Sequence, residues 1–176
     1  MSLSDKRQRL QRDPLQAAWL LSAENAIIGA DQGDGALTEA EGEMLGFLVF
    51  CTRGRARCSD AARIVLEPWL DEATGPGAAE SSSVEATTTG AATKSGNTAK
   101  KAKLVILVVG LSFGFSGEPW ARAWLSLRAK LGLDAAADEC LQRELLSDGT
   151  FGFGRVKPGQ ATEWLRALLL KLEVDA

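Results

Sequence analysis

One long stretch near the middle of the chain constrains the fold more than any other feature. Residues 72–103 consist mostly of Ala, Gly, Ser and Thr and contain almost no large apolar side chain. Such a segment buries too little apolar surface to offset the entropy lost on ordering. We therefore predict a disordered linker at 72–103, between a module at residues 10–71 and a second module at residues 104–176. Each module is small, and the two are expected to share a core if they pack together.

The first module is predicted to be helical. A helix is expected to start at Asp13, which suits an N-cap, and apolar residues recur after it with helical spacing. Thr38 followed by Glu41 is a capping box and predicts the start of a second helix. A third helix is expected from Cys58 onward, with a break, kink or restart at Pro68.

The second module is predicted to mix a short sheet with two to three helices, so the whole chain is α+β and mainly helical. Leu104–Val109 is short, apolar and rich in β-branched residues, which favours a buried strand. A helix is expected from Pro119. Two F-G-F segments, Phe113–Phe115 and Phe151–Phe153, are followed by similar helical patterns and are predicted to pair as short strands.

A G-x-S-x-G motif lies between this predicted strand and the helix after it. Gly110, Ser112 and Gly114 resemble the nucleophile elbow of the α/β-hydrolase family, which implies a nucleophilic Ser112. The chain has no histidine, so the family's usual catalytic base is missing, and we predict no catalytic residue. One alternative stays open: Gly110, Ser112, Gly114 and Gly117 form a turn that holds a ligand or a phosphate, with or without hydrolysis.

A second motif lies between the first two predicted helices. The twelve residues from Ala30 to Glu41 resemble the calcium loop of the EF-hand family, which implies Asp34 and Glu41 as calcium ligands. Ala30 stands where the family has aspartate, so we expect the loop to bind calcium weakly or not at all. A plain helix–turn–helix corner with a capping box is the alternative that we favour, and no cofactor is predicted.

The remaining features favour a non-catalytic subunit that binds another protein or self-associates. Trp120, Trp124 and Trp164 lie on leucine-rich helices and are the candidate contact residues, because tryptophan is enriched at binding hot spots. A net charge of −3 argues against a nucleic-acid partner. Membrane association through Leu104–Gly117 is an alternative, although this segment is short for a span. The cysteines lack a C-x-x-C spacing, which predicts reduced thiols and a cytoplasmic protein.

Overall fold

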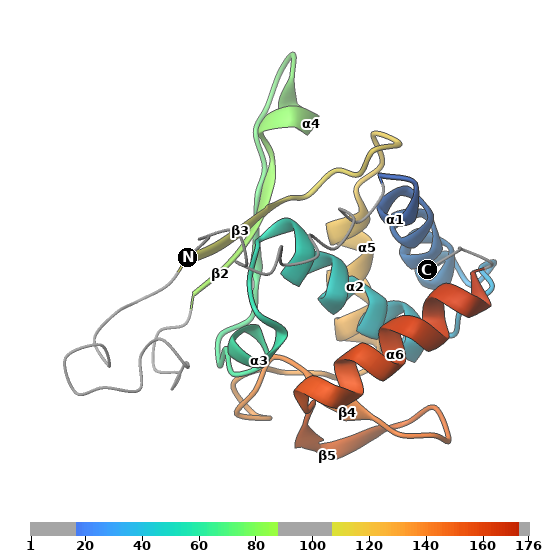
Figure 1. The fold of residues 1–176 in the computed structure, drawn as a ribbon. Helices are drawn as coiled ribbons and strands as arrows, with labels where there is room; N and C mark the ends of the chain where they lie inside the picture. The colour runs from blue at the N-terminus through green and yellow to red at the C-terminus, as the bar shows by residue number, and fades with distance from the viewer. Residues whose placement is uncertain (1–16, 88–106, 173–176) are drawn as a thin grey trace, which may run out of the picture.

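The computed structural model describes residues 17–87 and 107–172 (Figure 1). Within these ranges the chain forms helices and two small antiparallel sheets, which confirms the predicted mainly helical α+β class. The predicted helix start at Asp13 lies outside the described residues.

Three helices form the centre of the molecule. These are α1 (Ala17–Gln32), α2 (Glu39–Arg53) and α5 (Trp120–Lys130), and each packs against the other two. The fourth long helix, α6 (Pro158–Lys171), crosses α2 (Figure 1). Every residue in the range Gly42–Cys51 is buried, so α2 is a core helix that is covered on all sides.

The start of α2 confirms the predicted capping box. The backbone N–H of Thr38 donates to Glu41 Oε2 at 2.8 Å, and the N–H of Glu41 donates to Thr38 Oγ1 at 3.3 Å. The predicted third helix is only partly correct. Helix α3 is a single turn, Cys58–Ala61, and the chain then becomes extended as β1 (Trp69–Asp71) directly after Pro68. The helix ends well before Pro68, so the proline does not end it, and the predicted break at Pro68 is instead the start of a strand.

The larger sheet has the order β1-β2-β3, and all of its pairs are antiparallel. The central strand β2 (Ser83–Thr87) follows the short helix α4 (Ala78–Ser81), and β3 (Leu107–Leu111) forms the other edge. The prediction of a disordered linker is therefore wrong for its first half. Val84 and Ala86 are fully buried, and β2 is paired with a strand on each side, so this segment is ordered despite its low apolar content. The other part of the predicted linker, residues 88–103, lies outside the described residues.

The smaller sheet is a hairpin of β4 (Arg143–Leu145) and β5 (Phe151–Arg155). The prediction that the two F-G-F segments pair is wrong, since the first one lies in a turn after β3. The second pairs locally because Asp148 fixes a tight turn. Its Oδ1 accepts hydrogen bonds from the N–H and the hydroxyl of Thr150, at 2.9 and 2.7 Å.

One hydrophobic core joins the two predicted modules. The indole of Trp124 on α5 stacks on Phe50 of α2 with ring centroids 5.2 Å apart, and Trp120 stacks on Trp124 at 6.3 Å. The core also takes in Val108 of β3 and Leu168 of α6. Residues on both sides of the predicted linker thus share their apolar surface, as expected for segments too small to bury a core alone.

Candidate functional site

The glycine-rich turn after β3 is closed rather than open to a ligand. The Ser112 side chain is only 3% exposed, and its hydroxyl has no hydrogen-bond partner among the described residues. Its backbone N–H donates to the Ser82 carbonyl at 3.1 Å, and its carbonyl accepts from the Ala121 N–H at 3.2 Å. Strand β3 is an antiparallel edge strand, so the turn does not lie at the carboxyl end of a central parallel strand, where ligands usually bind.

The glycines of the motif serve close packing. A Cβ atom on Gly110 would lie 3.1 Å from Cβ of Arg53, and one on Gly114 would lie 2.4 Å from Glu24 Oε2. Gly117 has a φ of 79° and no neighbour near a Cβ, so its role is conformational. These contacts leave the proposed ligand turn without space next to Gly110 or Gly114.

A buried carboxylate on α1 holds this turn in place. Glu24 is fully buried, and its Oε1 accepts a hydrogen bond from Arg53 Nε at 2.7 Å. Its Oε2 accepts from the Phe115 N–H at 2.8 Å, and the Arg53 guanidinium lies 5.0 Å from the centre of the Phe115 ring. The only sequence signal for this contact is a single acid next to Ala23 on the apolar face of a helix.

A second buried charged cluster joins α2, α5 and the segment before β4. Glu43 Oε1 accepts from Arg128 Nη1 at 2.8 Å, and Glu43 Oε2 accepts from Gln142 Nε2 at 2.8 Å. Trp124 Nε1 also donates to Glu43, at 3.4 Å, while Arg128 Nη2 donates to Glu67 Oε1 at 2.8 Å. Burial raises the pKa of Glu43, and the charge of Arg128 offsets part of this rise.

Buried acids with shifted pKa values are often catalytic, and this cluster is therefore a candidate site. Its geometry fits a structural role better. Glu43 and Gln142 are completely buried and Arg128 is 1% exposed, so no substrate reaches the carboxylate. The donors around Glu43 already use both of its oxygens.

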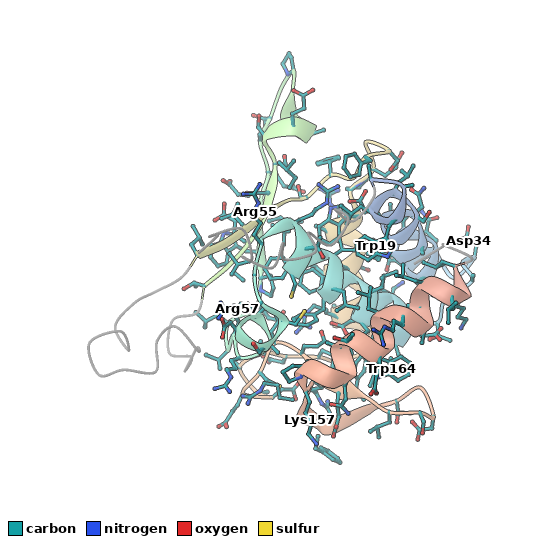
Figure 2. The ribbon with its side chains drawn as sticks, in the orientation of Figure 1. Trp19, Asp34, Arg55, Arg57, Lys157 and Trp164 are labelled. Carbon is teal, nitrogen blue, oxygen red and sulfur yellow. The ribbon has the colours of Figure 1, made fainter. Side chains whose placement is uncertain are left out.

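The predicted calcium loop is a tight corner between α1 and α2. Helix α1 continues past Ala30, and the N–H groups of residues 33, 34 and 35 all donate to the Gly29 carbonyl, at 2.9, 3.1 and 3.2 Å. Figure 2 shows Asp34 at this corner. The described residues contain no group of three or more His, Cys, Asp or Glu side chains that could hold a metal ion. Weak or absent calcium binding at Asp34 and Glu41 stays a prediction.

The carboxylate of Glu41 is already engaged by a cation of the chain itself. Lys171 Nζ on α6 donates to Glu41 Oε2 at 2.7 Å, while the same carboxylate caps α2 through Thr38. Burial raises the pKa of Glu41, but the hydrogen bonds from Lys171 and Thr38 outweigh burial and lower that pKa below its ordinary value.

The predicted contact tryptophans need a correction. Trp120 and Trp124 are fully buried and stack in the core, so neither reaches the surface to meet a partner. Trp120 Nε1 also donates to the Leu111 carbonyl at 3.0 Å, which ties α5 to the sheet. Trp164, on α6, is half-buried and remains partly accessible (Figure 2).

The apolar surface that a partner can reach lies instead on the sheet. Leu107, Val109 and Leu111 of β3 alternate with buried residues and point outward, with 54%, 42% and 48% of their surfaces exposed. We call these three side chains the outer face of β3. Trp69, 40% exposed, lies on the same side of the sheet, because Trp69 and Val109 are both paired with Glu85. Among the described residues, β3 pairs only with β2.

Comparisons with known proteins add no functional assignment. No family model matches the chain, and no curated protein or solved structure shows significant similarity to it. In the part of the chain that is described, no helix is long and apolar enough to cross a membrane, and residues 107–111 of the membrane alternative form a strand.

Proposed function

We propose that the protein is a non-catalytic structural subunit that self-associates through β3. The observation that carries this proposal is an apolar edge strand that, among the described residues, no other strand pairs with on its outer side, although the Leu111 carbonyl accepts a hydrogen bond from Trp120. Soluble proteins usually shield an edge strand with a lysine, a proline, a bulge or a covering segment. Strand β3 contains no charged residue and no proline, and its register with β2 is regular. Such an edge is suited to pairing with another strand.

The outer face of β3 is complementary to itself. Antiparallel pairing of two β3 strands about a two-fold axis at Val109 sets Leu107 of one copy opposite Leu111 of the other. All six aliphatic side chains then lie on one face of a continuous sheet, since alternate residues share a face. A two-fold interface of this kind uses the same patch on both subunits.

The lack of charged residues in this segment also favours a second copy of the chain as the partner that pairs with β3. The segment from Leu107 to Gly117 contains no charged residue, so two copies can approach without opposing like charges. The closed environment of Ser112 supports a binding role over a catalytic one, because a nucleophile must be accessible to its substrate.

Sedimentation equilibrium of the full chain over a range of concentrations tests this proposal. We expect a monomer–dimer equilibrium for the wild type, and we expect Val109→Lys to shift it to monomer, because lysine at the centre of the strand places two cations together. Leu170→Lys on α6 is the matched control. Leu170 is 73% exposed and lies on a different element, so this variant should dimerise like the wild type.

Two results would overturn the proposal. One is a wild-type chain that stays monomeric up to concentrations of hundreds of micromolar. The other is a dimer that Val109→Lys leaves intact, or that both lysine variants weaken equally. Circular dichroism confirms that each variant is folded before its mass is measured.

A further inference from the structure

A pocket of about 370 Å³ lies between α3, the β4–β5 hairpin and the start of α6. Its charged and hydroxyl side chains come from segments far apart in the chain: Ser59, Arg63, Glu144, Arg155 and Lys157. Figure 2 shows Lys157 where α6 begins. Small-molecule sites typically enclose about 300–1,000 Å³, so this volume is sufficient for a small ligand.

Positive charge dominates the pocket. Two cations, Arg155 and Lys157, line it together with one carboxylate, Glu144, and a third cation of the lining, Arg63, has a contact of its own. Glu144 Oε2 accepts a hydrogen bond from Gln160 Nε2 at 3.3 Å. In the part of the chain that is described, neither Arg155 nor Lys157 forms an ion pair.

The hairpin places two arginines directly opposite each other, which is unfavourable without a counter-charge. Arg143 of β4 is paired with Arg155 of β5, and like charges at such positions repel. Arg143 is compensated locally, because its Nη1 lies 3.7 Å from Asp138 Oδ1 and its Nε donates to the Gly152 carbonyl at 2.6 Å. Arg155 instead lines the pocket, where an anion would offset its charge.

The start of α6 adds to the positive electrostatic potential of the pocket. Pro158, the first residue of α6, also lines the pocket, so the positive end of the helix dipole is close to it. The Lys157 N–H is already satisfied by Gln160 Oε1 at 3.0 Å, so the helix end is capped on that side. The side chains, rather than this one N–H, are the groups available to a ligand.

We propose that this pocket binds a phosphate group, either as inorganic phosphate or as the monoester of a small organic molecule. A phosphate monoester carries a charge of about −1.5 to −2 at neutral pH, which the cations of the pocket can offset. The guanidinium group of Arg155 can donate two hydrogen bonds to its oxygens. Lys157 supplies a second cation, and Ser59 supplies a hydroxyl donor. This site is independent of self-association through β3.

Nuclear magnetic resonance titration of the ¹⁵N-labelled full chain tests the site with three probes: inorganic phosphate, ribose 5-phosphate and ribose. Ionic strength is held constant with sodium chloride, because screening alters charged contacts. We expect saturable shifts at Ser59, Gly154 and Val156 with both phosphates and none with ribose. Tighter binding of ribose 5-phosphate would identify a monoester as the ligand, and equal binding would identify phosphate itself.

Variants separate this site from a general attraction of anions. Arg155→Gln and Lys157→Gln should each weaken binding at least tenfold. Glu144→Gln should tighten it several-fold, because the variant removes the one negative charge and keeps an amide that can bond to Gln160. A misfolded variant cannot show such a gain. The matched control, Arg166→Gln, removes an exposed cation from α6 outside the pocket and should leave the dissociation constant unchanged.

The proposal is overturned if neither phosphate causes saturable shifts at tens of millimolar. It is also overturned if Arg166→Gln weakens binding as much as Arg155→Gln, or if Glu144→Gln has no effect on affinity. In these cases the cations of the pocket attract anions no more specifically than other exposed cations of the protein do.

Discussion

The indole of Trp124 lies directly against Gly46 where α5 crosses α2. A Cβ atom on Gly46 would lie 2.2 Å from Trp124 Cδ1, well inside van der Waals contact. The lack of a side chain at residue 46 therefore sets how closely the two helices approach. The same indole stacks on Phe50 and donates to Glu43, so its position determines both the packing and the polar contacts of the core.

We expect Gly46→Ala to destabilise the protein by about 1–3 kcal/mol, the usual cost of overpacking a core. Helix propensity alone predicts the opposite sign, a gain of about 1 kcal/mol. Gly159→Ala on α6 is the matched control, because a Cβ there meets nothing within 4 Å and should be neutral or stabilising. Urea unfolding followed by tryptophan fluorescence measures both. Equal effects of the two variants would contradict the packing argument.

The buried cluster around Glu43 leads to a second prediction. Arg128→Met should destabilise the fold by about 3–5 kcal/mol, because it leaves the Glu43 carboxylate buried without a cation. Arg122→Met, on the same helix, removes an ion pair with Glu72 in which the side chains are 63% and 47% exposed. Its cost should stay below about 1 kcal/mol. Chemical denaturation compares the two, and a loss for Arg128→Met no larger than that for Arg122→Met would contradict a structural role for the cluster.

Features encoded by neighbouring residues could be predicted from the sequence. The capping box of Thr38 and Glu41 needs only four residues, and the structure has it as predicted. The helix expected from Pro119 begins at Trp120, where proline suits a helix start. These signals do not depend on how distant segments pack, so the identity and spacing of a few neighbouring residues are sufficient to predict them.

Features that depend on distant segments were missed. Strand β2 has little apolar content of its own, and only pairing with β1 and β3 on its two sides makes it buried. The closed state of Ser112 likewise follows from Glu24 on α1, which is remote in sequence and fixes the turn through Phe115. The phosphate pocket combines Ser59 with Lys157, and no local pattern links two such positions.

The three cysteines should differ in reactivity. A hydrogen bond from the Cys51 thiol lowers the pKa of half-buried Cys58, although burial opposes this shift. Burial raises the pKa of Cys140 and raises that of Cys51 well above its ordinary value. Because the thiolate is the nucleophile, iodoacetamide should alkylate Cys58 first, with a rate that rises with pH around a midpoint below 9.0.

Mass spectrometry of the alkylated peptides over time measures this order. Cys51→Ala should move the midpoint for Cys58 upward, because it removes the donor that stabilises the thiolate. In urea all three thiols should react at similar rates, which controls for the intrinsic reactivity of each peptide. Earlier labelling of Cys140 than of Cys58 in the folded chain is the result that would count against this prediction.

The ion pair between Glu41 and Lys171 should make stability depend on pH in acid. The pKa of Glu41 is below its ordinary value of 4.5 in the folded chain, so the ionised carboxylate favours folding. This contribution is complete above pH 4.5 and disappears as the pH falls through the lowered pKa. Glu41→Gln keeps an oxygen that can cap α2 but loses the charge. Above pH 4.5 the wild type should therefore be more stable by about 0.2–1 kcal/mol, and the difference should shrink as the pH falls through the lowered pKa.

Urea denaturation of the wild type and Glu41→Gln between pH 2.5 and 7 measures this difference. Lys171→Met should abolish most of it, since the lysine is the cation that lowers the pKa of Glu41. Glu163→Gln, which changes an exposed acid elsewhere on α6, is the matched control and should show no such step in acid. If Glu41→Gln is as stable as the wild type at pH 7, or if its deficit persists unchanged at pH 2.5, the contact does not act through the charge of Glu41.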